Sequence, residues 1–346
     1  MKAAIYTEFG GLIEVRDVAD PAPEPDGVVV GVRATGLCLS DWHGWSGHDP
    51  DIVLPHVPGH ELAGVIEEVG SEVTRWKSGD RITVPFVSGC GHCRECQSGN
   101  EQVCDAQFQP GFTHWGSFAE RVSLHHADVN LVRLPDSMEF STAAALGCRF
   151  VTAYRAVVAQ GRVAAGEWVV VHGCGGVGLS AIQIANAFGA RVIAVDIRAD
   201  QLSLAADLGA SQILCVRNET DVVGQIREWT EGGAQLSIDA LGSEETCLHS
   251  ILCLRKRGRH IQVGLMVGDE ASPAIPMDRI LAHELELLGS HGIQSHAYPE
   301  IFGLIANGRL APNRLIGRTV SLQDVPELLP TMNDSKNTGM TVVTRF

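Results

Sequence analysis

Four of the ten cysteines lie within 15 residues and follow the spacing C-x2-C-x2-C-x7-C. They are Cys90, Cys93, Cys96 and Cys104, and glycines at positions 89, 91 and 99 let the loop bend. Four thiolates at such short spacing favour a closed, tetrahedral structural zinc site. An iron–sulfur cluster is the main alternative, but bacterial ferredoxins continue with a shorter gap and a proline, whereas Asp105 follows Cys104 here.

A second set of metal-ligating residue types is spread along the chain. It comprises Cys38, the motif Gly59-His60-Glu61 and the pair Gly147-Cys148. A zinc protease motif, H-E-x-x-H, would need a histidine at position 64, which is glycine. Taken singly, Cys148 fits a small buried hydrophobic residue and His60 a hydrogen-bonded loop histidine. The residues alone therefore leave both interpretations open.

Two kinds of pattern surround these residues. Up to about residue 147 the chain shows short β-like runs broken by glycine and proline, which predict an all-β unit with long loops. From about 150 to 289 apolar strands alternate with helices, which predicts an α/β fold with a doubly wound parallel sheet. Strands of that sheet are expected at 168–171, 192–195, 212–216, 236–239, 260–263 and 285–288, and helices at 177–188 and 202–208. The final 57 residues, 290–346, are too few for another such unit and are expected to rejoin the first.

The first strand of the second unit runs into a G-x-G-x-x-G pattern, Gly173-Cys174-Gly175-Gly176-Val177-Gly178. Such a turn bends tightly at Gly173, lets the backbone approach a pyrophosphate at Gly175, and packs helix against strand at Gly178. Asp196 ends the next strand at about the spacing expected for a carboxylate that binds ribose hydroxyls and repels a 2′-phosphate. The pattern predicts an NAD site, with only Arg198 pointing towards NADP. The alternative is a cofactorless domain with a chance glycine turn.

The composition limits the classes of function. A chain of 346 residues exceeds what one core usually organises, so we expect two domains. The net charge of −15 argues against a nucleic-acid partner or an anionic membrane surface. The N-terminal residues fit a first β-strand better than a signal peptide. We therefore expect a cytoplasmic protein whose clustered cysteines bind metal and form no disulfides.

Together these features resemble the zinc-containing alcohol dehydrogenases of the medium-chain dehydrogenase/reductase family over essentially the whole chain. The matching features are the segment from Cys38 to His43, Gly59-His60-Glu61 with the glycines at 64 and 70, the four-cysteine lobe, Gly147-Cys148 and the glycine turn. The resemblance implies a GroES-like catalytic domain at 1–149, with a structural zinc lobe at about 89–105, and a Rossmann NAD-binding domain at 150–289. Residues 290–346 would return to the catalytic domain, and the active site would lie in the cleft between the domains.

The family's metal ligands carry over residue by residue. The resemblance implies that Cys38, His60 and Cys148 bind a catalytic zinc and leave one position open for substrate, in addition to the structural zinc. Asp41 would be the carboxylate that orients the His60 ring. Glu61 matches the acidic neighbour of the metal in this family and would serve as a transient ligand.

The resemblance also implies a path for the proton and the hydride. Ser40 would take the proton of the substrate hydroxyl and pass it through the cofactor ribose towards His43, while a hydride moves to the nicotinamide beside Thr152. The alternatives are a loop hydroxyl for Ser40 and a surface histidine for His43. Many relatives carry basic residues at the positions of Met340 and Gln201. Their absence here is expected to affect how tightly the cofactor binds.

Three aromatic residues, Trp45, Phe86 and Trp115, are candidate walls of a pocket for a primary aliphatic or aromatic alcohol and its aldehyde, although each also fits a core position. The compact length resembles tetrameric microbial members of the family, which implies a homotetramer. The closest alternative function is a related zinc dehydrogenase for secondary alcohols, polyols or threonine. An alternative of another class is a non-catalytic, NAD-binding zinc protein with a sensor or structural role.

Overall fold

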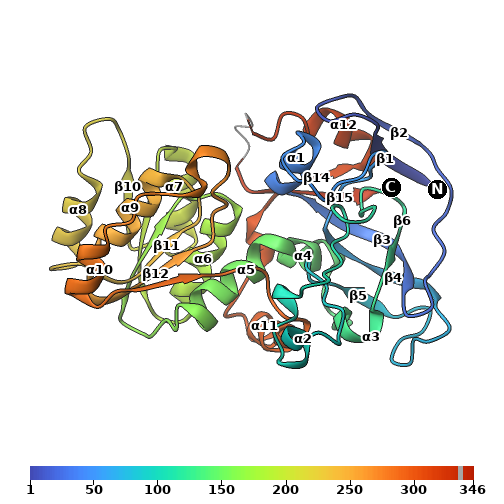
Figure 1. The fold of residues 1–346 in the computed structure, drawn as a ribbon, viewed down its shortest axis with the longest axis horizontal. Coiled ribbons are helices and arrows are strands. Elements are labelled where there is room, and N and C mark those ends of the chain that lie inside the picture. The colour runs from blue at the N-terminus through green and yellow to red at the C-terminus, as the bar shows by residue number, and fades with distance from the viewer. Residues whose placement is uncertain (334–337) are drawn as a thin grey trace. The chain divides into compact units, whose positions relative to one another are not determined.

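A computed structural model of the chain describes residues 1–333 and 338–346, and Figure 1 shows its helices and strands. The chain forms two compact units. The first combines Met1–Cys148 with Gly292–Phe346, and the second is Arg149–His291. Within the described part of the chain, no helix is both long enough and apolar enough to cross a membrane.

The first unit is built around a seven-stranded sheet with the order β14-β15-β3-β4-β5-β7, in which β6 also pairs with β3. Valine-rich β3 is buried at every position except Arg33, as expected for β-branched residues inside a sheet. Because β14 and β15 come from the C-terminal segment, that segment completes the sheet of the first unit. The strands are β1 (Lys2–Tyr6), β2 (Ile13–Asp17), β3 (Val28–Leu37), β4 (Glu61–Val69), β5 (Arg81–Thr83), β6 (Arg121–Leu124), β7 (Val132–Arg133), β14 (Ile316–Ser321) and β15 (Met340–Arg345).

Short helices occupy several connections of the first unit. They are α1 (Leu39–Trp45), α2 (Arg94–Gln97), α3 (Ala127–Asn130), α4 (Phe140–Ala145), α11 (Tyr298–Ala306) and α12 (Val325–Leu328). The predicted mainly β character is confirmed, but the prediction of long loops up to residue 147 is wrong where α1 and α4 form. A helix of six or seven residues makes about two turns, so its sequence contains too few repeats for a helical pattern to stand out.

The second unit contains a six-stranded parallel sheet with the order β10-β9-β8-β11-β12-β13, the doubly wound order of a dinucleotide-binding fold. The predicted α/β class is therefore confirmed. The strands are β8 (Trp168–His172), β9 (Arg191–Asp196), β10 (Gln212–Cys215), β11 (Ala234–Asp239), β12 (Leu254–Gln262) and β13 (Glu286–Gly289). The helices are α5 (Val151–Tyr154), α6 (Gly176–Ala187), α7 (Ala199–Asp207), α8 (Val222–Trp229), α9 (Glu244–Leu252) and α10 (Met277–His283). Four of these helices, α5, α8, α9 and α10, were not predicted from the sequence.

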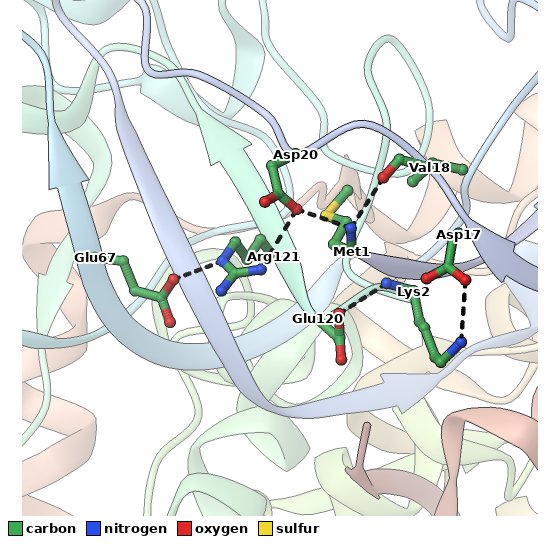
Figure 2. A network of polar contacts seen from close by, with 8 residues as sticks. All are labelled: Met1, Lys2, Asp17, Val18, Asp20, Glu67, Glu120 and Arg121. Atoms are coloured by element: carbon green, nitrogen blue, oxygen red, sulfur yellow. Dashed lines mark hydrogen bonds and ion pairs between the residues drawn. The ribbon is translucent and has the colours of Figure 1, made fainter.

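The N-terminal strand of the first unit is held by a chain of ion pairs (Figure 2). The terminal amine of Met1 lies 2.8 Å from an Asp20 oxygen, which is 3.4 Å from the Arg121 guanidinium. Arg121 in turn lies 2.7 Å from Glu67. Because Asp20 is 61% exposed, water screens its ion pairs, and we assign this chain of charges a local role in fixing β1 against the sheet.

Candidate active site and metal centres

Four potential metal ligands from three separate segments meet in the first unit. The ligand atoms of Cys38, His60, Glu61 and Cys148 all lie within 4.8 Å of one another. Cys38 directly follows β3 and Glu61 begins β4, and the antiparallel pairing of these strands sets Gly36 opposite Glu61. The sheet register therefore brings the first three ligands together.

The fourth ligand, Cys148, lies in the segment Leu146–Phe150, where a kink at Gly147 (φ 12°, ψ −141°) interrupts the helical backbone. The preceding residue, Gly147, lies so close to Glu61 that a Cβ added there would meet the Glu61 Cβ at 2.5 Å. Only glycine permits this approach of the backbone. The glycine of the Gly147-Cys148 pair thus explains how the Cys148 sulfur reaches the other three ligands.

Asp41 is the residue that fixes two of these ligands. Its carboxylate is 1% exposed and accepts hydrogen bonds from the His60 ring nitrogen Nδ1 at 2.9 Å, the Cys38 backbone N–H at 2.9 Å and the Gly59 backbone N–H at 3.0 Å. With Nδ1 donating to Asp41, the lone pair of Nε2 is left to bind a metal. This is the arrangement of a carboxylate behind a metal-ligating histidine.

The residues present fit a zinc ion on two further grounds. His60 Nε2 is buried and has no hydrogen-bond partner among the described residues, so a ligand is missing at that atom. Burial by itself lowers the pKa of His60, but the Asp41 carboxylate and the Cys38 sulfur reverse this and raise it well above its ordinary value. The surroundings therefore stabilise positive charge, which a bound cation supplies, and two sulfurs with an imidazole are a ligand set that zinc accepts.

Helix α1 places the proposed proton-transfer residues beside this centre. Ser40 and His43 are three residues apart on α1 and so lie on one face of the helix. Ser40 Oγ lies 3.7 Å from the Cys38 sulfur, and His43 Nδ1 lies 3.0 Å from Nδ1 of His48, which is exposed. Burial and the neighbouring His48 lower the pKa of His43, while the Cys38 sulfur acts in the opposite direction. His48, which follows α1, was not predicted from the sequence because it belongs to no motif.

The aromatic neighbours of His60 are only partly those expected. The ring of Phe86 is centred 6.1 Å from the His60 ring, and that of Phe112 is closer at 5.0 Å. Trp45 packs against the core of the first unit, and its Nε1 donates to Gly11 O at 2.9 Å. Trp115 is 38% exposed and donates to the carbonyl of Pro55. Phe112 was not predicted, because nothing in its local sequence indicates which way its ring points.

Tyr298 is a third residue near the metal ligands that was not predicted from the sequence. It begins α11 in the C-terminal segment, is 1% exposed, and its hydroxyl has no hydrogen-bond partner among the described residues. Burial raises the pKa of Tyr298, and the nearby charges of Cys148 and Glu61 raise it further. The tyrosine is therefore a neutral neighbour of the metal ligands.

The four-cysteine lobe forms a separate sulfur cluster. The sulfurs of Cys90, Cys93, Cys96 and Cys104 all lie within 4.8 Å of one another. Backbone amides point at these sulfurs, for instance Cys90 N–H at 3.3 Å from Cys104 Sγ. Backbone hydrogen bonds from Cys96 and Asp105 lower the pKa of Cys93 to about 6, whereas burial raises that of Cys96 to about 12. Four convergent sulfurs that receive backbone N–H groups fit a structural zinc ion.

The glycine turn of the second unit has the geometry expected of a dinucleotide site. Gly173 has φ +87°, and a Cβ on Gly178 would lie 1.8 Å from the Gly173 carbonyl oxygen, so both positions require glycine. Gly175 faces open space. The Asp196 carboxylate at the end of β9 accepts the Cys174 N–H at 2.6 Å, which ties the second strand to the turn.

Two more residues of the predicted cofactor site lie in the same unit. The Arg198 side chain forms an ion pair with Asp200, which is half exposed. Thr152 in α5 is buried, and its hydroxyl has no hydrogen-bond partner among the described residues. Val177, the second residue of α6, contributes one of the backbone amides at the start of that helix. Gln201 in α7 and Met340 in β15 are both buried.

Comparisons with known proteins agree with this geometry. Residues 24–136 match the family described as alcohol dehydrogenase GroES-like domain, and residues 176–307 match the zinc-binding dehydrogenase family. An alcohol dehydrogenase of Geobacillus stearothermophilus is 36% identical over 292 residues, which is 84% of each chain.

Solved structures extend the likeness to the whole chain. The alcohol dehydrogenase TADH from Thermus sp. ATN1 has a TM-score of 0.91 at 28% identity and covers 100% of both chains. A structure described as an NAD-dependent alcohol dehydrogenase has a TM-score of 0.89 at 30% identity, again with 100% of both chains covered. The chain belongs to the zinc-containing alcohol dehydrogenase family of the medium-chain dehydrogenase/reductase superfamily. Within it, the protein is an oxidoreductase of the alcohol dehydrogenase type.

Proposed function

We propose that the protein catalyses reversible hydride transfer between a primary alcohol and NAD, with a zinc ion held by Cys38, His60 and Cys148. The observation that carries this proposal is the buried, unpartnered Nε2 of His60, which lies in a cluster with two sulfurs and a carboxylate. Three protein ligands with a fourth position for substrate are the arrangement of catalytic zinc sites, whereas the four-sulfur lobe is closed. Glu61 is the nearby carboxylate that can replace a departing ligand.

The bound groups supply two pieces of chemistry. Zinc in such a site is a Lewis acid that lowers the pKa of a hydroxyl group beside it, and NAD accepts a hydride from the alcohol carbon. The chain must therefore orient its ligands, remove one proton from the substrate and hold the nicotinamide. Asp41 performs the first task, because its three hydrogen bonds fix the His60 ring and the Cys38 backbone.

Removal of the proton falls to residues of α1. Ser40 Oγ, next to the Cys38 sulfur, would accept the proton of the substrate hydroxyl and release its own hydroxyl proton towards His43. The contact between His43 and exposed His48 then gives the proton a route to water. Because its pKa is lowered, His43 is neutral near pH 7 and ready to accept that proton.

The second unit supports NAD as the cofactor. The turn with Gly173, Gly175 and Gly178 leads into the N-terminus of α6, where Gly176 and Val177 present their amides to phosphates. The Asp196 carboxylate disfavours a 2′-phosphate, and Arg198 is already paired with Asp200. The unpartnered hydroxyl of Thr152 is the group we assign to contact with the nicotinamide.

The rings of Phe86 and Phe112 beside His60 support an apolar substrate, and this favours primary aliphatic or aromatic alcohols over polyols. Trp45 and Trp115 remain predicted pocket residues. We also propose that the enzyme works in the cytoplasm as a homotetramer. A reducing compartment would keep the cysteines of both metal sites available as thiolates, and sedimentation equilibrium measures the assembly.

The test combines metal analysis with turnover. We expect two zincs per chain and formation of NADH with ethanol or benzyl alcohol. Turnover should be slower with 2-propanol, sorbitol or threonine as the substrate, and slower when NADP replaces NAD. Cys148→Ala should lose one zinc and its turnover, whereas the control Cys215→Ala, at a half-buried cysteine of β10 outside both clusters, should keep both. Faster turnover of a polyol or of threonine would reassign the substrate. Full zinc with no turnover of any alcohol would support a sensor instead.

A further inference from the structure

A cluster of basic side chains lies at the edge of the second unit's sheet that is opposite the dinucleotide turn. Arg255, Lys256 and Arg257, near the start of β12, are three consecutive basic residues in a chain of net charge −15, and all three are exposed. Because the strands are parallel, the start of β12 lies at the opposite edge from the end of β8, where the glycine turn begins. Arg257 pairs with exposed Glu284 at 3.5 Å. The cluster is therefore separate from the predicted cofactor site.

Two arginines from neighbouring helices are fixed beside this basic turn. Helix α8 packs against α9, and α9 and α10 both pack against β12 (Figure 1). Arg227, in the last turn of α8, donates through Nη1 to the Leu254 carbonyl at 3.4 Å. Arg279 of α10 donates through Nη2 to the Leu252 carbonyl at 3.2 Å, and its Nε is buried without a partner among the described residues. The backbone thus holds both guanidinium groups in place and leaves most of their five N–H groups unused.

The positive charges of this cluster repel one another. Within the part of the chain that the structure describes, Arg227, Lys256 and Arg279 form no ion pair with a carboxylate. The pKa of His283, one helical turn after Arg279 on α10, reflects the crowding. Burial lowers this pKa, and the charges of the same three side chains lower it further. Gathering like charges costs free energy, and an anion bound among them would offset that cost.

A compact anion fits the cluster better than an extended one. Guanidinium groups bind the oxygens of a phosphoryl group in pairs, and a lysine adds a point charge. Exposed carboxylates flank the cluster on the same helices, since Glu228 follows Arg227 and Asp278 precedes Arg279. A long polyanion such as nucleic acid would meet these carboxylates, whereas a single phosphoryl group would not. We propose that Arg227, Lys256 and Arg279 bind the phosphoryl group of a small molecule, at a site distinct from that of the cofactor.

Isothermal titration of the full, zinc-loaded chain tests the proposal, with inorganic phosphate and glycerol phosphate as ligands and sodium chloride keeping the ionic strength constant. Arg227→Met and Arg279→Met each remove one guanidinium, and Lys256→Met removes a charge at an exposed position. The matched control is Arg33→Met, at an exposed arginine of β3 in the first unit that has no ion pair among the described residues. Because phosphate can also bind at the glycine turn, each titration is repeated with excess NADH.

We expect Arg227→Met and Arg279→Met to weaken both ligands by about 10- to 100-fold, as for loss of hydrogen bonds between charged groups. Lys256→Met should weaken them by up to about 5-fold, because an exposed ion pair contributes less. Arg33→Met and excess NADH should leave both affinities unchanged. Weaker binding of inorganic phosphate than of glycerol phosphate would indicate that the site also contacts the rest of a phosphorylated molecule, and equal binding that it holds the phosphoryl group alone; either result supports the proposal.

The other outcomes overturn it. The site does not exist if the parent protein binds neither ligand, or if the three variants bind them as the parent does. An equal loss in Arg33→Met would show a general effect of surface charge, and displacement by NADH would place the phosphate at the glycine turn. Tighter binding of a DNA duplex that the same variants weaken would assign the cluster to nucleic acid. If an arginine variant does not fold, Lys256→Met decides, because Lys256 is exposed and its loss breaks no ion pair of the described fold. None of these results depends on turnover of alcohol.

Discussion

The substitution Asp41→Asn isolates the residue that stands behind the proposed catalytic metal. The side chain keeps its size but loses its charge and one of its two acceptor oxygens. In the structure Asp41 Oδ1 accepts from His60 and Gly59, and Oδ2 accepts from the Cys38 N–H. If the amide oxygen keeps the first two bonds, the amide NH2 group faces the Cys38 N–H and two donors oppose each other.

The size of the effect follows from this count. A hydrogen bond to a charged group contributes about 1.5–3 kcal/mol, and Asp41→Asn loses at least one. Loss of a carboxylate behind a ligating histidine typically weakens metal binding by about 10- to 100-fold, or roughly 1.4–2.8 kcal/mol. The two estimates agree. We therefore expect the catalytic site to bind zinc about 10- to 100-fold more weakly. The four-cysteine site should bind zinc as before, because its ligands include none of those that Asp41 holds.

The assay is zinc content per chain after dialysis against chelator buffers that fix the concentration of free zinc. As the concentration of free zinc is lowered, Asp41→Asn should lose its catalytic zinc at a free-zinc concentration about 10- to 100-fold higher than the parent protein does. Asp80→Asn is the control, since Asp80 is also buried in the first unit but pairs with Arg133. The reasoning is refuted if Asp41→Asn retains zinc like the parent, or if Asp80→Asn loses it equally.

Three further predictions follow from the same structure. Gly178→Ala should abolish NADH binding in a titration and lower the stability of the fold, because its Cβ would lie 1.8 Å from the Gly173 carbonyl oxygen. Gly175→Ala, whose Cβ would face open space, should still fold. Equal stability of the two variants would contradict the close approach of Gly178 to Gly173. Cys96→Ser should remove one zinc and lower the thermal midpoint while NADH affinity stays the same, and a retained second zinc would argue against the sulfur cluster. Burial lowers the pKa of His172 from 6.5 to about 3, so the unfolded chain binds a proton there that the folded one does not. Stability should rise with pH between these values, and His172→Gln should reduce the slope by about 1.4 kcal/mol per pH unit in denaturant titrations; an unchanged slope would refute this.

The dinucleotide turn could be predicted from the sequence because its determinants are local. The apolar run of β8, the glycines after it and the apolar periodicity of α6 are consecutive in the chain, so each element constrains the next. The sulfur cluster was predictable for the same reason, since its four cysteines fall within 15 residues. Both patterns could be recognised because their residues are close together in the sequence.

The catalytic ligands are a different case, because 110 residues separate Cys38 from Cys148 and no local pattern joins them. Only the likeness to a family suggested the set. The sheet register, with Gly36 opposite Glu61, then accounts for three of the ligands, and the close approach of Gly147 to Glu61 accounts for Cys148. The orientation of aromatic side chains was also beyond the sequence. Trp45, for example, lies two residues after His43 on α1, about 200° further around the helix, and its partly buried ring packs against the core of the first unit.

Phe112, Tyr298 and His48 were not predicted for one shared reason. Each becomes informative only through a neighbour brought close by folding: His60 for Phe112, Cys148 and Glu61 for Tyr298, and His43 for His48. Their side chains lie in no motif that would single them out.

We propose that the metal held by Cys38, His60 and Cys148 contacts the substrate. Replacing zinc by cobalt makes this visible, because the absorption of cobalt in the visible range changes when its ligands change. We predict that addition of alcohol with NAD alters the cobalt spectrum of the parent protein, and that Cys148→Ala, which retains the four-cysteine site, shows no such change. If the parent protein turns over alcohol but its cobalt spectrum does not change when substrate is added, this metal does not contact the substrate.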